Sequence, residues 1–121
     1  DRFLKAQIIA KDLQRQYEVP EYSIDSGSKI VVYGAGNVGT EFKDYFEETN
    51  QYKIVAWVDK DYVKYCNNNL SVENPRELRD SEFDYLLICV ASEHTANEIR
   101  QELLHIGISE RKIIWEKPKL I

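Results

Sequence analysis

Residues Lys29 to Asp59 read KIVVYGAGNVGTEFKDYFEETNQYKIVAWVD. An apolar run at 30–33 is followed by a glycine turn, an amphipathic segment at 37–48, a second apolar run at 54–58, and a carboxylate. Continuous runs of β-branched and aromatic residues are typical of buried parallel strands. The stretch therefore predicts a strand, a helix and a second strand, in that order.

Three glycines follow the first strand in the pattern G-x-G-x-x-G: Gly34, Gly36 and Gly39. In a strand–turn–helix unit each glycine has its own function. Gly34 permits the tight turn, Gly36 lets the backbone approach a pyrophosphate, and Gly39 lets the helix lie close to the strand. The pattern predicts a site for the phosphates of a nucleotide.

The residues between these glycines, Ala35, Asn37 and Val38, belong to the same candidate site. The turn contains no Lys or Arg, so a phosphate would be bound by backbone donors. The helix that begins near Asn37 would direct its free N–H groups and the positive end of its dipole toward that phosphate.

Asp59 ends the second strand, about twenty residues after Gly39, where an acidic residue typically binds the ribose of a dinucleotide. A carboxylate there accepts hydrogen bonds from the 2′- and 3′-hydroxyls and repels a 2′-phosphate, so NAD is favoured over NADP. Lys60, next in the chain, weakens that preference. The alternative is a glycine turn that packs well and binds nothing.

The composition limits the class of protein. The chain has 121 residues, 43% hydrophobic and 31% charged, as in one soluble globular domain. A net charge of −5 argues against a nucleic-acid surface, and no apolar run approaches the roughly twenty residues that span a bilayer. The two cysteines, Cys66 and Cys89, form no disulfide framework, which favours reduced thiols and a cytoplasmic setting.

Two features concern the organisation of the chain. The sequence contains no Met, so we expect a piece of a longer polypeptide. Residues 1–17 carry an apolar stripe at helical spacing and predict a helix, so the expected division is an N-terminal helix and linker over 1–25 and a nucleotide-binding domain over 26–121. The helix would pack on its own domain, on other domains of the parent protein, or in a homodimer.

The rest of the chain predicts six elements. The first three are a loop or short helix over 61–69, a candidate short strand over 70–72, and a short helix from Asn74-Pro75 through Leu78 or Arg79. A strand over 83–91, a helix and a last strand over 112–115 follow. Ser92 caps that helix and Gly107 ends it, and its inward face consists of Ala96, Ile99, Leu103 and Leu104. Tyr62 and Tyr65 either flank a base or pack as partly buried residues.

These elements predict an α/β fold with a doubly wound parallel sheet in the strand order 3-2-1-4-5. The order reverses between the strands that end at Tyr33 and Ala91. Ligands of such sheets bind outside the carboxyl ends of the strands at this point. Ala91 and Ser92 therefore join the candidate cofactor site.

No catalytic constellation is visible. His94 is either an acid–base group or a solvated residue of a first helical turn, and Glu93 is better explained as a first-turn carboxylate. Cys89 is a poor candidate nucleophile because burial raises the pKa of a thiol. The histidines and cysteines lack metal-ligand spacing, and Tyr-x-x-x-Lys, Gly-x-Ser-x-Gly and Walker motifs are missing.

Two resemblances rest on these residues. Gly34-Ala35-Gly36-Asn37-Val38-Gly39 resembles the fingerprint of lactate and malate dehydrogenases, without their substrate domain. VVYGAGNVGTEF, VAWVDKD, LSVENPREL, FDYLLICVAS and LLHIGISERKIIW together resemble the small Rossmann module, sometimes labelled CoA-binding-like, of bacterial surface-polysaccharide proteins. That resemblance implies a nucleotide, NAD(H) or a nucleotide-sugar as ligand, with Gly34, Gly36, Gly39 and Asp59 as contacts.

Three functions remain open at this point. The favoured one is a nucleotide-binding module of a larger bacterial sugar-modifying enzyme, such as a glycosyltransferase or nucleotide-sugar dehydratase, with catalysis elsewhere. The second is an NAD-dependent oxidoreductase whose substrate domain is not in this chain. The third is a degenerate domain used for assembly.

Overall fold

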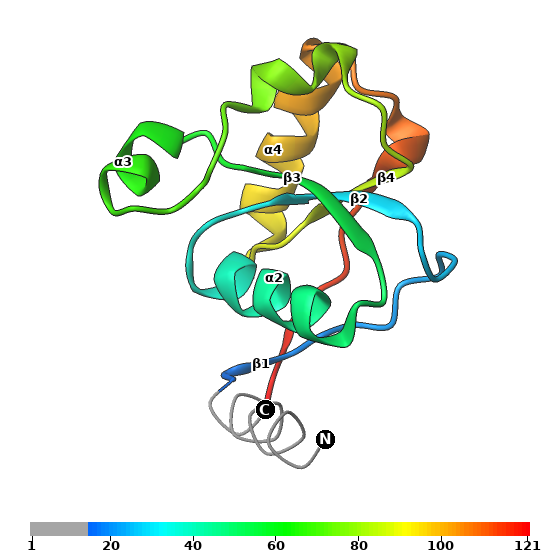
Figure 1. Cartoon of the computed structure of the whole chain (residues 1–121). Coiled ribbons are helices and arrows are strands. Elements are labelled where there is room, and N and C mark those ends of the chain that lie inside the picture. Colours follow the sequence, from blue (N-terminus) through cyan, green and yellow to red (C-terminus); the bar gives the residue numbers. More distant parts are fainter. Residues whose placement is uncertain (1–14) are drawn as a thin grey trace.

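The central element of the fold is a four-stranded parallel sheet, seen in a computed structural model that describes residues 15–121 (Figure 1). Its strand order is β3-β2-β4-β5, and each neighbouring pair is parallel. The strands are β2 (Lys29–Tyr33), β3 (Lys53–Val58), β4 (Tyr85–Ile88) and β5 (Ile113–Ile114). The carboxyl ends of β2, β3 and β4 therefore lie at one edge of the sheet.

Helices cover both faces of this sheet because β2 and β4 are apolar on both sides. Helix α2 (Asn37–Thr49) buries Val38, Phe42 and Phe46 in one core cluster with Ile30 and Val32 of β2. The other face of β2 packs in a second cluster.

Helix α4 (Glu93–His105) covers that second face. Its residues Ala96, Ile99 and Leu103 are buried there with Val31 and Tyr33, and Leu104 is partly buried. The Ser92 side chain accepts a hydrogen bond from Thr95 N at 3.3 Å, and Gly107 follows the helix with a φ of +100°. The predicted cap, inward face and end of this helix are confirmed.

The connections contain three short helices: α3 (Tyr62–Asn67), η1 (Pro75–Asp80) and η2 (Glu110–Lys112). The predicted start of η1 is confirmed, because Asn74 Oδ1 accepts from Arg76 N at 3.0 Å and Pro75 is its first residue. Helix α3 has no buried residue and lies to one side of the sheet (Figure 1).

The predicted five-strand order 3-2-1-4-5 is wrong. Residues 70–72 form no strand, because Val72 N donates to Leu70 O at 3.0 Å in a tight turn and Cys66 Sγ lies 3.0 Å from Val72 O. The next residue, Glu73, forms an isolated parallel bridge with Val58, in which Glu73 N donates to Trp57 O at 2.8 Å and Asp59 N donates to Glu73 O at 3.2 Å. The α/β class itself agrees with the sheet and its helices.

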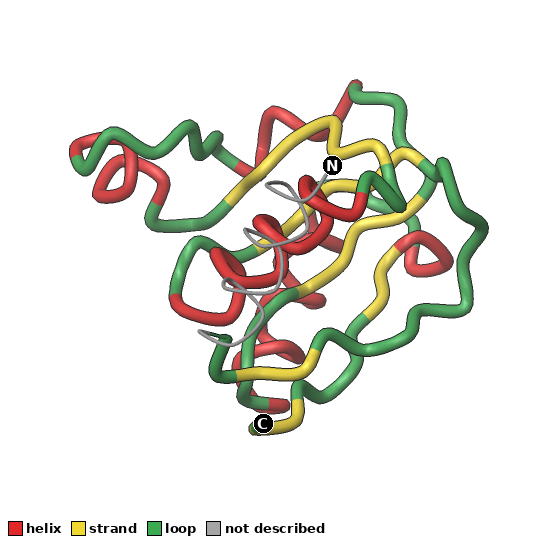
Figure 2. Tube along the Cα trace, turned by 60° about the horizontal axis from the view of Figure 1, so that its bottom comes forward, coloured by secondary structure: helices red, strands yellow, loops and turns green. Residues whose placement is uncertain are grey.

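A small antiparallel sheet was not predicted. Strand β1 (Tyr17–Glu18) pairs with β6 (Lys119–Leu120), so the two ends of the described chain lie side by side (Figure 2). The sequence predicts a helix through Tyr17, which is wrong for that residue; the rest of that helix falls largely on residues 1–14, outside the described part. Within residues 15–121, no helix has the length and apolar character needed to cross a membrane.

Candidate functional site

The glycine turn joins β2 to α2 at the carboxyl edge of the sheet. Gly34 has a φ of +125°, and a Cβ there would lie 2.7 Å from the carbonyl oxygen of Cys89. A Cβ on Gly39 would lie 1.9 Å from the carbonyl oxygen of Gly34. The fold itself therefore requires glycine at both positions, for the turn and for the close approach of the helix.

Gly36 differs from the other two glycines. Its φ of −77° and ψ of −161° are extended backbone that any residue adopts, and the residue is exposed. A Cβ there would meet only Tyr65 Oη, at an ordinary distance of 3.9 Å. Packing within the described residues gives no reason for glycine at this position.

Among the residues that the structure describes, the leading end of α2 is open. Gly36 is its N-cap residue and provides no side-chain cap, and no acidic residue lies in the first turn. The first N–H groups of a helix have no partner within the helix. These donors, with the positive end of the helix dipole, face the edge of the sheet where the cavities described below open.

Asp59 holds the turn from the neighbouring strand. Its Oδ2 accepts from Ala35 N at 2.9 Å and its Oδ1 accepts from Asp61 N at 2.8 Å. The residue is 9% exposed. Each carboxylate oxygen has a second lone pair, so the group can accept further hydrogen bonds from a ligand.

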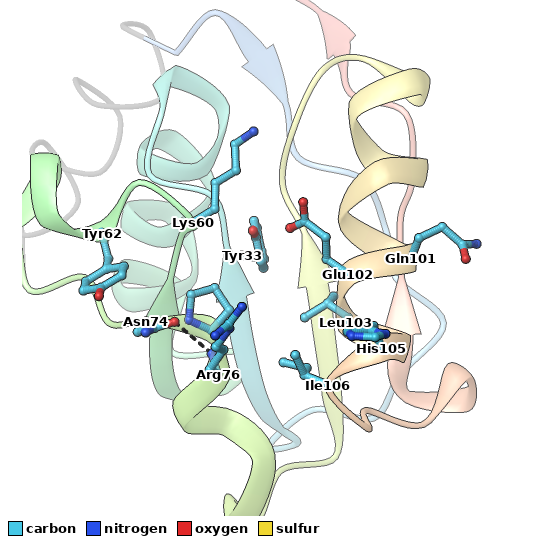
Figure 3. Close-up of a pocket in the computed structure, with 11 residues that line it drawn as sticks. Tyr33, Lys60, Tyr62, Asn74, Arg76, Gln101, Glu102, Leu103, His105 and Ile106 are labelled. Atoms are coloured by element: carbon cyan, nitrogen blue, oxygen red, sulfur yellow. Dashed lines mark hydrogen bonds between the residues drawn. The ribbon is translucent and has the colours of Figure 1, made fainter.

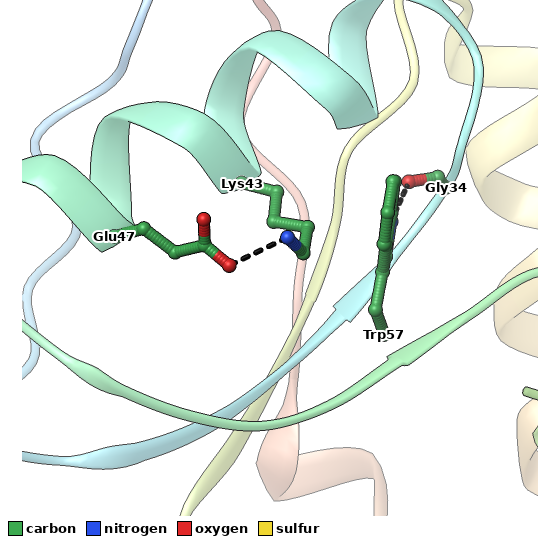
Figure 4. A network of polar contacts seen from close by, with 4 residues as sticks. All are labelled: Gly34, Lys43, Glu47 and Trp57. Carbon is green, nitrogen blue, oxygen red and sulfur yellow. Dashed lines mark hydrogen bonds and ion pairs between the residues drawn. The ribbon is translucent and has the colours of Figure 1, made fainter. Parts of the chain in front are cut away.

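Trp57 contacts the glycine turn on the α2 face of the sheet (Figure 4). Its indole Nε1 donates to the Gly34 carbonyl oxygen at 2.6 Å. Lys43 Nζ lies 4.6 Å from the centre of the Trp57 ring and pairs with Glu47 at 2.5 Å. The turn is therefore fixed by side chains from β3 and α2 before any ligand binds.

A cavity of about 280 Å³ lies above the turn. Seven of the predicted cofactor residues line it: Gly34, Gly36, Asn37, Val38, Asp59, Lys60 and Ala91. It also has lining residues that the sequence did not predict for the site, namely Tyr33, Asp61, Cys89, Val90, Thr95 and Ile99. We call this cavity the turn cavity.

Three predicted cofactor residues do not line the turn cavity. Ala35 is buried, and its N–H donates a hydrogen bond to Asp59 Oδ2. Gly39 is buried where α2 meets Gly34, and Ser92 caps α4. Their positions match packing and capping functions.

A second, larger cavity of about 690 Å³ lies between α4 and η1 (Figure 3). It shares Tyr33 and Lys60 with the turn cavity, so the two adjoin at these residues. Its other lining residues are Tyr62, Asn74, Pro75, Arg76, Gln101, Glu102, Leu103, His105 and Ile106. We call it the helix cavity; of the residues that the sequence singled out for a ligand, Lys60 and Tyr62 line it.

The structure also places the other residues that the sequence analysis singled out. His94 Nε2 lies 2.6 Å from Glu98 Oε1 on the exposed surface of α4. Burial raises the pKa of the Cys89 thiol, so it is a weak nucleophile. Tyr65 lines the turn cavity and Tyr62 the helix cavity. Among residues 15–121, no three His, Cys, Asp or Glu side chains are grouped so as to hold a metal ion.

The comparison with protein families identifies the domain. Residues 26–114 match the family described as C2185-like, N-terminal, and the chain belongs to this family. No curated protein matches the chain. The expected membership in the small Rossmann module of bacterial surface-polysaccharide proteins is therefore wrong; the motifs quoted for it are ones that many parallel α/β domains share.

Proposed function

We propose that this C2185-like N-terminal domain binds a nucleotide, NAD(H) or a nucleotide-sugar, with its diphosphate at the glycine turn. The phosphates would accept hydrogen bonds from the open N–H groups at the start of α2. The domain supplies binding only, and the chemistry of the ligand is carried out by another domain or protein.

The observation that carries this proposal is Gly36. The fold explains Gly34 and Gly39 by contacts shorter than a Cβ allows, but a Cβ on Gly36 would meet only Tyr65 Oη at 3.9 Å. Gly36 is exposed on the wall of the turn cavity. A ligand that lies directly against the backbone supplies the reason for glycine that the fold does not.

Asp59, directly after β3, supports the same proposal. Its carboxylate lines the turn cavity, and its free lone pairs can accept from the 2′- and 3′-hydroxyls of a ribose. A 2′-phosphate next to this acid would be repelled, so NAD is favoured over NADP. The cavity of about 280 Å³ is at the lower end of the range for small-molecule sites, which suits the ribose and diphosphate rather than a whole dinucleotide.

Thermal-shift titration tests the proposal, with NAD, NADH, UDP-glucose and coenzyme A as ligands. A ligand at 100 times its dissociation constant stabilises a folded domain by about 2.7 kcal/mol. We expect stabilisation by NAD or UDP-glucose. In Gly36→Ala, which has room for its Cβ, we expect the unliganded domain to stay folded and the stabilisation to be lost.

The control is Glu110→Gln, a change on the exposed surface of η2, which should respond to ligand as the natural chain does. Unchanged melting with every ligand would contradict nucleotide binding and favour a domain used for assembly. Equal stabilisation of Gly36→Ala and the natural chain would contradict binding at the turn.

A further inference from the structure

The hydroxyl of Tyr33 is buried without a hydrogen-bond partner. Tyr33 is 2% exposed, and among residues 15–121 its oxygen has no partner at hydrogen-bond distance and angle. The backbone N–H of Lys60 is near enough to lower the pKa of Tyr33, but an N–H can only donate. The hydroxyl hydrogen thus lacks an acceptor, and an unpaired buried polar group in a folded protein needs an explanation.

Tyr33 lies where the two cavities meet. It ends β2, directly before the glycine turn, and lines both the turn cavity and the helix cavity. In a nucleotide the base is bonded directly to the ribose. A nucleotide whose ribose is held by Asp59 in the turn cavity therefore places its base in the helix cavity, over Tyr33.

Glu102 lies across the helix cavity from η1. Figure 3 shows its carboxylate projecting from α4 toward Tyr33, with Arg76 on the opposite side of the cavity. Burial and then the nearby Glu102 carboxylate raise the pKa of Tyr33, so the phenol keeps its proton and acts as a donor. The cavity thus presents a donor and an acceptor close together.

The remaining walls suit a flat ring. Pro75 on one side and Leu103 and Ile106 on the other are apolar, and the Arg76 guanidinium can stack on an aromatic face. A nucleobase has two apolar ring faces, which such walls can contact, and polar edges that need hydrogen-bond partners. The polar edge decides which base fits.

We propose that the helix cavity selects a base whose Watson–Crick edge places an exocyclic amino group beside an unprotonated ring nitrogen, adenine or cytosine, because Tyr33 donates to the ring nitrogen and Glu102 accepts from the amino group. This inference rests on the proposed nucleotide binding at the turn. In hypoxanthine and uracil, a keto oxygen and a ring N–H replace the amino group and the ring acceptor. The keto oxygen would then face the Glu102 carboxylate, acceptor against acceptor, whereas the Tyr33 hydroxyl oxygen could still accept from the ring N–H, so the mismatch lies at Glu102.

Calorimetric titration with ADP, IDP, CDP and UDP tests this inference, since each pair differs mainly in the amino and keto groups. We expect ADP to bind at least about tenfold tighter than IDP, or CDP than UDP, as expected for one lost hydrogen bond. The ADP and CDP results show which base is used. Glu102→Gln should bring the two members of the preferred pair to within about threefold, since an amide can also donate to a keto oxygen. Tyr33→Phe should weaken binding of the preferred member about tenfold, since one hydrogen bond to the base is lost.

The matched controls are Tyr85→Phe, at the opposite end of the sheet, and Glu110→Gln on η2; both should keep the full preference. Equal affinity within both pairs would overturn the base inference while leaving diphosphate binding at the turn, if Gly36→Ala still abolishes it. A preference that survives in Glu102→Gln, or unchanged affinity in Tyr33→Phe, would also overturn it. No binding of any of the four nucleotides would contradict both proposals.

Discussion

At the scale of single residues, the three glycines of one motif differ in what the fold requires of them. Gly34 needs its positive φ, and Gly39 is in contact with the backbone of Gly34. Gly36 has neither constraint. Sequence spacing predicts all three together, and only the contacts that a Cβ would make separate the structural glycines from the one that the fold leaves unexplained.

This difference predicts that two matched substitutions change the free energy of unfolding by very different amounts. In Gly39→Ala the new Cβ would meet the Gly34 carbonyl oxygen at 1.9 Å, so the free energy of unfolding should fall by about 3 kcal/mol or more. In Gly36→Ala it should change by less than about 1 kcal/mol. Urea denaturation followed by circular dichroism measures both, and a large loss in Gly36→Ala would remove the argument from that residue.

Asp59 has a structural function that the sequence did not predict. It accepts from Ala35 N and Asp61 N, whereas an amide at this position has one acceptor oxygen and would leave one N–H unpaired. Asp59→Asn should therefore lower the free energy of unfolding by about 1–3 kcal/mol, without any ligand. Asp61→Asn, on an exposed residue, is the control and should change it by less than about 0.5 kcal/mol. Equal effects of the two would contradict this function.

At the scale of elements, the sequence predicts what depends on local signals. β2, β3, α2 and α4 follow from apolar runs, helical spacing and caps. The segment 70–72 reads as a strand, but its backbone turns and its neighbour Cys66 contacts Val72 O. The β1–β6 pair joins residues about a hundred positions apart, and two-residue strands carry no periodic signal.

The caps give a test at this scale. Ser92 Oγ accepts from Thr95 N at the start of α4, whereas Ser109 begins η2 without a side-chain cap. Ser92→Ala should lower the free energy of unfolding by about 1 kcal/mol. Ser109→Ala is its matched control and should change it far less. Thermal denaturation compares the two, and similar losses would show that the Ser92 cap contributes nothing specific.

At the scale of the whole molecule, the reactivity of the two cysteines tests how the core is packed. Cys66 is exposed, whereas Cys89 is buried behind the glycine turn, where burial raises the pKa of its thiol. At pH 8 a raised pKa means less thiolate, so Cys89 should stay unlabelled in the folded chain. A thiol reagent should modify one cysteine in the native state and two in denaturant. Cys66→Ser should abolish the native reaction; rapid labelling of Cys89 in that variant would contradict the buried core.

The candidate site was predictable only in part. The glycine turn and Asp59 were visible because motif spacing places them at one sheet edge. Tyr33 and Glu102 were not, because Tyr33 is one more residue of the apolar run at 30–33 and no sequence signal singled out Glu102. Their meeting depends on how α4 lies across β2, which local sequence patterns do not specify.

The central claim is that backbone amides at the start of α2 bind a diphosphate. It is tested most directly by amide chemical shifts in a ¹⁵N-labelled chain during titration with ADP, with adenosine as the comparison. The account predicts that ADP produces its largest shifts at Gly36, Asn37 and Val38 and that adenosine leaves these three amides nearly unchanged. Shifts confined to other parts of the chain, or identical shifts with both ligands, would contradict it.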